Sequence, residues 1–180
     1  MMSWLKRKLP RFAPSKAVEL RRATAEDGRF IFEACLTQAK KGHLNGDFGD
    51  PRVQAGLAKQ ISCAIGDAPV PMPGARDGAA TVIWMLTVDG APVGFTMFLE
   101  DRPGSWDKKV ELFMVALDEA YHGLGLGRFM VAKLLSGVQT EVMYARCRAP
   151  STRMKAILER EGFKTIGESA AGTAAMELRR

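Results

Sequence analysis

The segment from residue 110 to residue 137 constrains the fold of this chain most strongly. An apolar run ends at Asp118, and three glycines, Gly123, Gly125 and Gly127, then alternate with leucine. A helical apolar pattern follows at once, which predicts a strand, a glycine loop and a helix in succession. Glycine allows positive φ and a close approach of the backbone to a ligand. Because a helix N-terminus favours negative charge, a phosphate-bearing ligand is the first hypothesis for this loop.

Other interpretations of the glycine loop are a structural turn without a ligand, a dinucleotide-binding loop and a P-loop. A dinucleotide-binding loop requires a third glycine three positions after the second, but Gly127 is followed by Arg128, Phe129 and Met130. No Gly-Lys-Ser/Thr sequence closes the loop, which excludes a P-loop. The structural turn remains open at this point.

Periodicity and turn signals predict the remaining elements. Thr24 with Asp27 predicts one helix start, Asp50 followed by Pro51 predicts another, and Asp89-Gly90 predicts a hairpin. The expected order is strand 18–22, helix 25–41, polar loop 42–50, helix 51–65, loop 66–80, strands 81–88, 92–99 and 109–117, helix 126–137, strand 141–147, helix 151–161, and strands 163–168 and 173–178. This order predicts an α/β (α+β) domain with a mixed sheet.

The positive charge of the chain is concentrated in one segment. The formal net charge is +6, but residues 1–16 carry five basic and no acidic residues, so the remainder is close to neutral. We therefore expect a basic arm at 1–16, a single domain at 17–180 and no nucleic-acid partner. The arm could touch a membrane or a partner as a short amphipathic segment. We favour an arm without that role, since Pro10 and Pro14 limit any helix there.

Cysteine usage and hydropathy bear on compartment and metal binding. Cys35, Cys63 and Cys147 are odd in number and lack metal-ligand spacing, so no metal site and no disulfide framework are expected. This pattern suits a reducing cytoplasm. The N-terminus lacks the apolar region of a signal peptide, and no run is long enough to span a membrane.

Two motifs resemble those of the GCN5-related N-acetyltransferase (GNAT) superfamily. Residues 122–127, His-Gly-Leu-Gly-Leu-Gly, resemble that family's acyl-CoA loop, Gln/Arg-x-x-Gly-x-Gly/Ala, with His122 in place of Gln/Arg. Residues 151–163 resemble its Asn-x-x-Ala-x-x-Leu-Tyr-x-x-x-Gly-Phe segment, with Ser151 in place of Asn and Leu158 in place of Tyr. Residues 19–27 are similar to the family's opening strand and helix start.

The resemblance implies a GNAT-like fold, with a mixed, mostly antiparallel central sheet flanked by helices on both faces. It implies an acetyl-CoA-dependent N-acetyltransferase that acts on a primary amine by direct attack in a ternary complex. Acetyl-CoA would be the co-substrate, an amine the second partner, and a homodimer is among the assemblies that the family allows. The implied acetyl-CoA-binding residues are Val115, Leu117, His122, Gly123, Leu124, Gly125, Leu126, Gly127, Arg128 and Ser151.

A general base must remove the proton of the ammonium before the nitrogen can attack. Glu111 is the first candidate, because family members often carry a glutamate near the start of this strand. Strict alternation would place Glu111, Phe113 and Val115 on one face. Glu100 and Asp101 are reserve candidates, and a charge pair of Glu111 with Lys108 or Lys109 is the competing interpretation.

The general acid is unassigned, because Leu158 stands where the family commonly has its acidic Tyr. Ser151, Tyr144 or water could protonate the thiolate, or it could leave into solvent. Arg146, Arg148 and Arg153 are candidate contacts for the nucleotide phosphate. Loop acids at positions 47, 50, 67 and 77 could attract a cationic amine, and His43 is interpreted as an ordinary surface residue. Two alternative functions remain: an acyl-CoA-binding module without catalysis, and a protein docked through its arm.

Overall fold

A computed structural model describes residues 17–72, 75–101 and 109–180 of the chain. The predicted basic arm at 1–16 lies outside these residues. The elements are β1 (Val18–Arg22), η1 (Ala25–Asp27), α1 (Gly28–Lys40), α2 (Pro51–Ile65), β2 (Val70–Met72), β3 (Ala75–Val88), β4 (Ala91–Asp101), β5 (Lys109–Leu117), η2 (Glu119–Tyr121), α3 (Leu126–Gly137), β6 (Val142–Cys147), α4 (Thr152–Arg160), β7 (Lys164–Glu168) and β8 (Ala174–Arg179).

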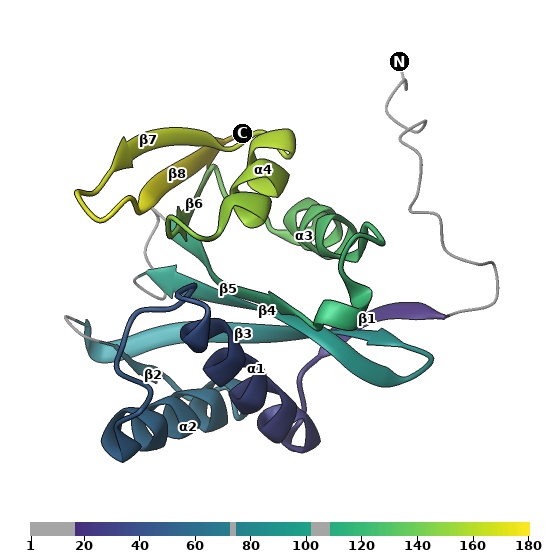
Figure 1. Cartoon of the computed structure of the whole chain (residues 1–180), viewed down its shortest axis with the longest axis vertical. Coiled ribbons are helices and arrows are strands. Elements are labelled where there is room, and N and C mark those ends of the chain that lie inside the picture. The colour runs from purple at the N-terminus through teal and green to yellow at the C-terminus, as the bar shows by residue number, and fades with distance from the viewer. Residues whose placement is uncertain (1–16, 73–74, 102–108) are drawn as a thin grey trace.

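One mixed sheet organises the described part of the chain. Its strand order is β1-β3-β4-β5-β6-β8-β7, with β2 paired to β3, which makes eight strands among the described residues. Among these strands only β5 and β6 pair in parallel. Helices α1 and α2 cover one face and α3 and α4 cover the other (Figure 1). The expected α/β fold with a mostly antiparallel sheet flanked on both faces is therefore confirmed.

Two hydrophobic clusters hold these layers together. The cluster on the α3/α4 face is built around Met130, Met143 and Leu158, and the cluster on the α1/α2 face is built around Ile31 and Phe95. All five side chains are almost fully buried. In the part of the chain that the structure describes, no helix is both long enough and apolar enough to cross a membrane.

The local signals at the helix starts and at the hairpin are confirmed. Thr24 and Asp27 form a capping box, and the Asp50 carboxylate accepts from the Arg52 backbone N–H at the start of α2. The turn between β3 and β4 has positive φ at both Asp89 and Gly90, as the favoured two-residue hairpin turn requires. These turns set the register of the first half of the sheet.

The predicted loop at 66–80 is wrong over most of its length. Residues from Val70 onward form a hairpin in which Val70 pairs with Ala79, and β3 begins at Ala75. Proline is tolerated because β2 is a short edge strand that pairs through its non-proline residues. Helix α2 fixes it further, since Gln60 Nε2 donates to the Pro71 carbonyl over 2.8 Å.

Candidate active site

The candidate site begins where the two parallel strands separate. Strands β5 and β6 pair only from Lys109–Leu112 to Val142–Ala145, and β5 continues beyond this ladder to Leu117. The Asp118 N–H donates to Val93 on the opposite side, in β4. Since backbone groups alternate in direction along a strand, the peptide groups of Val115 and Leu117 face the open side. The two strands therefore splay and leave backbone donors and acceptors for an extended ligand.

A glycine loop connects this open edge to helix α3. Gly123 and Gly125 have φ of +77° and +80°, and the first helical hydrogen bond runs from the Phe129 N–H to the Gly125 carbonyl over 2.9 Å. The N–H groups of residues 126–128 precede that bond, so they have no acceptor within the helix. They project from the positive end of the helix dipole, which suits a phosphate group. Leu124, 41% exposed, lies at the tip of the loop.

Gly127 has a different role from the two glycines before it. It lies inside α3, and a Cβ placed there would be 3.5 Å from Ile157 Cδ1 of α4 and 3.9 Å from Leu117 Cδ2. These are ordinary contact distances, so the protein itself leaves room for a methyl group at this position. The conformational demand for glycine falls on Gly123 and Gly125.

Two of the predicted phosphate contacts are already engaged within the protein. His122 Nε2 lies 3.0 Å from the Leu117 carbonyl and donates to it, which leaves Nδ1 to face an Arg153 nitrogen at 3.5 Å. Arg128 Nε donates to the Glu161 carboxylate over 2.9 Å. Arg153 is therefore the arginine of α4 that the structure brings to the glycine loop. Arg128 would have to share its charge between Glu161 and a ligand.

An arginine holds the carboxylate of Glu111. Arg146 donates to both of its carboxylate oxygens, over 2.8 Å and 2.9 Å. Tyr144 of β6 pairs with Glu111, which places Arg146 nearby on the same face of β6. Of the two lysines in the competing interpretation, Lys108 lies outside the described residues. The guanidinium loses part of its favourable interaction when the carboxylate is protonated. Arg146 is thereby occupied away from the glycine loop.

The expected alternation holds for residues 111 and 113 but is wrong for residue 115. Met97 pairs with Met114 and Phe98 with Leu112, so Phe113 is an extra residue in a β-bulge. Val115 packs with the cluster on the α3/α4 face, whereas Glu111 pairs with Leu99 of the cluster on the α1/α2 face. A bulge inserts one residue and reverses the facing of the residues after it. Glu111 and Val115 therefore lie on opposite faces of the sheet.

The start of α4 brings Ser151 to an unexpected partner. Ser151 is the N-cap residue, yet its hydroxyl forms no capping bond and lies 2.8 Å from His43 Nδ1. The interpretation of His43 as an ordinary surface residue is therefore wrong. The one available signal was Gly42, which ends α1 and fixes the direction of the next residue. Leu158 is 1% exposed and presents no proton donor.

The other candidates for acid and base do not gather here. Tyr144 is the ladder partner of Glu177 in β8. Arg148 extends toward the α1–α2 connection and donates to the Leu44 carbonyl over 2.6 Å. Glu100 is the partner of Val110 at the far end of the β4–β5 ladder, and the side chain of Asp101 lies outside the described part.

Three of the loop acids are used inside the protein, so they offer little to a cationic acceptor. Asp67 pairs with Arg22, Asp50 caps α2, and Asp47 accepts from the Gly49 N–H. The side chain of Asp77 lies outside the described residues.

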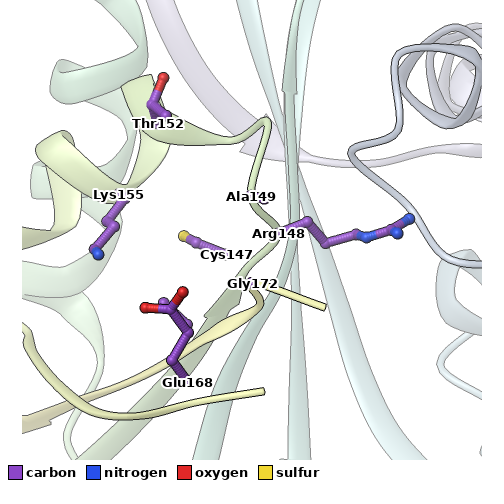
Figure 2. Close-up of a pocket in the computed structure, with 8 residues that line it drawn as sticks. Cys147, Arg148, Ala149, Thr152, Lys155, Glu168 and Gly172 are labelled. Atoms are coloured by element: carbon purple, nitrogen blue, oxygen red, sulfur yellow. The ribbon is translucent and has the colours of Figure 1, made fainter. Parts of the chain in front are cut away.

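Two of the three cysteines, Cys35 and Cys147, are buried and do not supply a reactive thiol. Burial raises the pKa of Cys35 to about 12 and that of Cys147 to about 11. The Cys147 sulfur faces a pocket of about 210 Å³ near Lys155 and Glu168 (Figure 2). A thiol is a weak nucleophile while it is protonated, so neither side chain is set up to carry an acyl group. Among the described residues no cluster of three or more metal-binding side chains occurs.

Comparison with known proteins identifies the class. The sequence model of the Acetyltransferase (GNAT) family matches residues 58–163, more than half of the chain. This chain therefore belongs to the GNAT acetyltransferase family. A search of curated proteins finds no match.

Solved structures agree on the fold. A GNAT-family acetyltransferase of Streptococcus agalactiae has a TM-score of 0.65 at 15% identity, covering 91% of this chain and 95% of that one. The PaiA N-acetyltransferase of Thermoplasma acidophilum, in complex with coenzyme A, has a TM-score of 0.59 at 13% identity, covering 91% and 99%. An aminoglycoside N(6')-acetyltransferase of Legionella pneumophila has a TM-score of 0.63 at 15% identity, covering 90% and 91%.

Proposed function

We propose that this protein is an acetyl-CoA-dependent N-acetyltransferase that acetylates a primary amine by direct attack in a ternary complex. The observation that carries this proposal is the continuity between the splayed edge of β5 and the N-terminus of α3. The Val115 and Leu117 peptide groups suit an extended amide-bearing arm, and the amides of residues 126–128 suit a pyrophosphate. Acetyl-CoA carries both groups, the amide-bearing arm and the pyrophosphate, in one ligand.

The phosphate end of the ligand would meet the glycine loop. Gly123 and Gly125 give the loop the positive φ that turns it into α3, and no side chain at these positions stands between ligand and backbone. Arg153, beside His122, adds positive charge on the α4 side. His122 keeps the loop folded against Leu117 through its hydrogen bond to that carbonyl. Ser151 would contribute from the start of α4.

Burial of Cys35 and Cys147 supports direct attack over an acyl-enzyme route through either of these thiols. An acyl-enzyme route through a thiol would need a thiolate near neutral pH, and burial of Cys35 and Cys147 opposes it. In direct attack the amine loses a proton, its lone pair attacks the thioester carbonyl, and the C–S bond breaks with its electron pair on sulfur. The nitrogen of the adduct then loses a second proton, and the thiolate takes up one. Glu111 can serve as base only after it releases Arg146.

All three cysteines are free, which fits a reducing compartment, so we place this activity in the cytoplasm.

A second candidate function is an acyl-CoA-binding module without catalysis. Two observations favour it: Leu158 is buried where the family has its Tyr, and the Glu111 carboxylate is fully engaged by Arg146. Turnover separates the two candidates, because both predict that acetyl-CoA binds.

The test is release of the CoA thiol by purified protein in the presence of acetyl-CoA and one amine at a time. The panel contains a polyamine, an aminoglycoside, a free amino acid and a lysine-bearing peptide. The aminoglycoside is included because one structural neighbour is an aminoglycoside acetyltransferase. We expect thiol release with at least one amine, matched by an acetyl mass increase on its nitrogen. Binding of acetyl-CoA without turnover across the panel would leave the binding module as the function.

A further inference from the structure

Residues 41–44, here called the strap, contact the segments that follow both diverging strands. Lys41 forms an ion pair with Glu119, which follows β5. The Leu44 carbonyl accepts from Arg148, which follows β6. The strap is thus tied to the segments that follow both diverging strands, and Gly42 and His43 lie between its two ties.

The backbone of the strap is fixed by the way in which α1 ends. The Gly42 N–H donates to the Ala39 carbonyl over 2.9 Å, and the His43 N–H donates to the Gln38 carbonyl over 3.0 Å. With φ of +77° at Gly42, these two bonds form a Schellman motif. A Cβ at Gly42 would lie 3.5 Å from Pro150 Cγ, so the strap also packs beside the start of α4. His43 therefore leaves the helix in a set direction.

Ser151 fixes the imidazole ring itself. Its hydroxyl lies 2.8 Å from His43 Nδ1 and does not cap α4, although serine at this position usually does so. When Nδ1–H donates to Ser151, the lone pair of the neutral ring lies on Nε2. His43 makes no other side-chain hydrogen bond among the described residues. A base oriented by a hydroxyl through its other nitrogen has the arrangement found in proton-transfer sites.

The surroundings of His43 keep the ring neutral. Partial burial lowers its pKa from the ordinary value near 6.5, and the charges of Lys41 in the strap and of Arg148, which follows β6, lower it further. A neutral imidazole accepts a proton at pH 7 without breaking an ion pair. The Glu111 carboxylate differs, since both of its oxygens already accept charge-assisted hydrogen bonds from Arg146.

We propose that His43 is the general base of the transfer and that Ser151 positions it. This inference rests on the proposed N-acetyltransferase function. His43 Nε2 takes one proton from the acceptor ammonium, and the freed nitrogen lone pair attacks the thioester carbonyl. The C–S bond breaks with its electron pair on sulfur, and the thiolate is protonated by the second proton leaving the acceptor nitrogen. The imidazolium returns its proton to solvent, which completes the proton balance.

The kinetic test compares five variants, Glu111→Gln among them, with the wild type, using the best amine from the panel. His43→Gln should lower kcat at pH 7 by about 10²- to 10³-fold, the range expected for loss of a general base. Its KM for acetyl-CoA should stay within about threefold of the wild type if the group acts in proton transfer. Ser151→Ala should lower kcat less and move the acidic limb of the pH profile, whereas Ser151→Thr, which keeps the hydroxyl, should restore both. Glu33→Gln, which breaks only an exposed ion pair with Arg29 on the same helix, should leave kcat unchanged.

The acidic limb of the pH–rate profile would not move if the role of His43 were purely structural. The wild-type rate should fall as pH decreases below 6.5, because protonation removes the base form of His43. The residual rate of His43→Gln should lack this limb. The chain has two histidines, so His43→Gln also assigns the imidazole NMR signals directly. The His43 ring should titrate below 6.5, and a titration at or above 6.5 would count against the proposal.

The outcomes separate this inference from the proposed function. An active wild type with an inactive His43→Gln variant that still binds acetyl-CoA supports both. In a second outcome the wild type is active, and its rate and the acidic limb of its pH profile survive in His43→Gln but are lost in Glu111→Gln. This result overturns the role of His43 and leaves the proposed function standing. A wild type that binds acetyl-CoA but acetylates no amine overturns the proposed function, and the role of His43 falls with it.

Discussion

The same methyl group should have opposite effects at two neighbouring glycines, Gly125 and Gly127. Gly125 has φ of +80° and stands immediately before α3, whereas Gly127 lies inside the first turn of the helix. Gly125→Ala places an L side chain in the left-handed region. Gly127→Ala places a good helix former in a helix. The pair of variants therefore tests the loop geometry on which the proposed acetyl-CoA site depends.

The magnitudes follow from the backbone and from the space around each Cβ. An L residue in the left-handed region costs about 1–2 kcal/mol. At Gly127 the new Cβ would lie 3.5 Å from Ile157 Cδ1, an ordinary contact, and replacing glycine with alanine in a helix contributes up to about 1 kcal/mol. For a domain of this size, 1 kcal/mol shifts Tm by roughly 2–4 °C. We expect Gly125→Ala to lower Tm by about 2–8 °C and Gly127→Ala to raise it by up to about 4 °C.

Thermal unfolding and urea unfolding without ligand measure both effects, with the wild type as reference. A second set of melts with saturating acetyl-CoA should show a smaller ligand-induced rise in Tm for Gly125→Ala than for Gly127→Ala. Each ligand-induced rise reports differential binding to the folded state. A destabilised Gly127→Ala, or a Gly125→Ala variant as stable as the wild type, would refute the loop conformation described here.

Three further predictions concern the buried carboxylate at the first helix, the buried residue at the family's Tyr position and the ion pair on β5. Asp27→Asn should destabilise the protein by about 3 kcal/mol, since the buried carboxylate accepts from both Arg21 and Thr24. The Arg21 hydrogen bonds hold the pKa of Asp27 below its usual 3.8. The contribution of Asp27 to the free energy of unfolding is therefore present above pH 3.8 and is lost as pH falls through the lowered pKa. Urea unfolding from pH 7 to 3 should show this loss in the wild type and not in Asp27→Asn. Leu158→Tyr should lower stability by about 1–3 kcal/mol in thermal unfolding, because the site is closely packed. Arg146→Gln should change stability by less than about 1 kcal/mol, since Arg146 is 62% exposed, and should leave the acidic limb of the rate profile in place. If the acidic limb of the rate profile moves in Arg146→Gln, the general base is Glu111.

Local sequence signals predicted the elements around the site well. The strand at 109–117 and the helix at 126–137 occur with the expected bounds, because an apolar run, positive-φ glycines and a helical pattern act over a few residues. The capping box at Thr24 and the hairpin at Asp89-Gly90 also depend only on neighbours in sequence. Such features are decided by backbone conformation and by the nearest side chains.

Features decided by distant contacts were not predictable in this way. The bulge at Phe113 depends on the register of β4 against β5, which no short motif encodes. The Glu111–Arg146 pair requires the parallel pairing of β5 with β6. His43 meets Ser151 across 108 positions of sequence, through a strap whose ties form only in the folded protein. The hairpin from Val70 was hidden by prolines, because its formation depends on an edge position in the sheet.

The most direct test of the acetyl-CoA site is a calorimetric titration of the purified protein with acetyl-CoA. A Gly125→Glu variant, shown to be folded by its circular dichroism spectrum, is titrated alongside. We predict saturable binding in the micromolar range by the wild type and its loss in the variant, because a carboxylate would then stand at the positive end of α3. No binding by the folded wild type would contradict the proposed site and reduce the glycine loop to a structural turn.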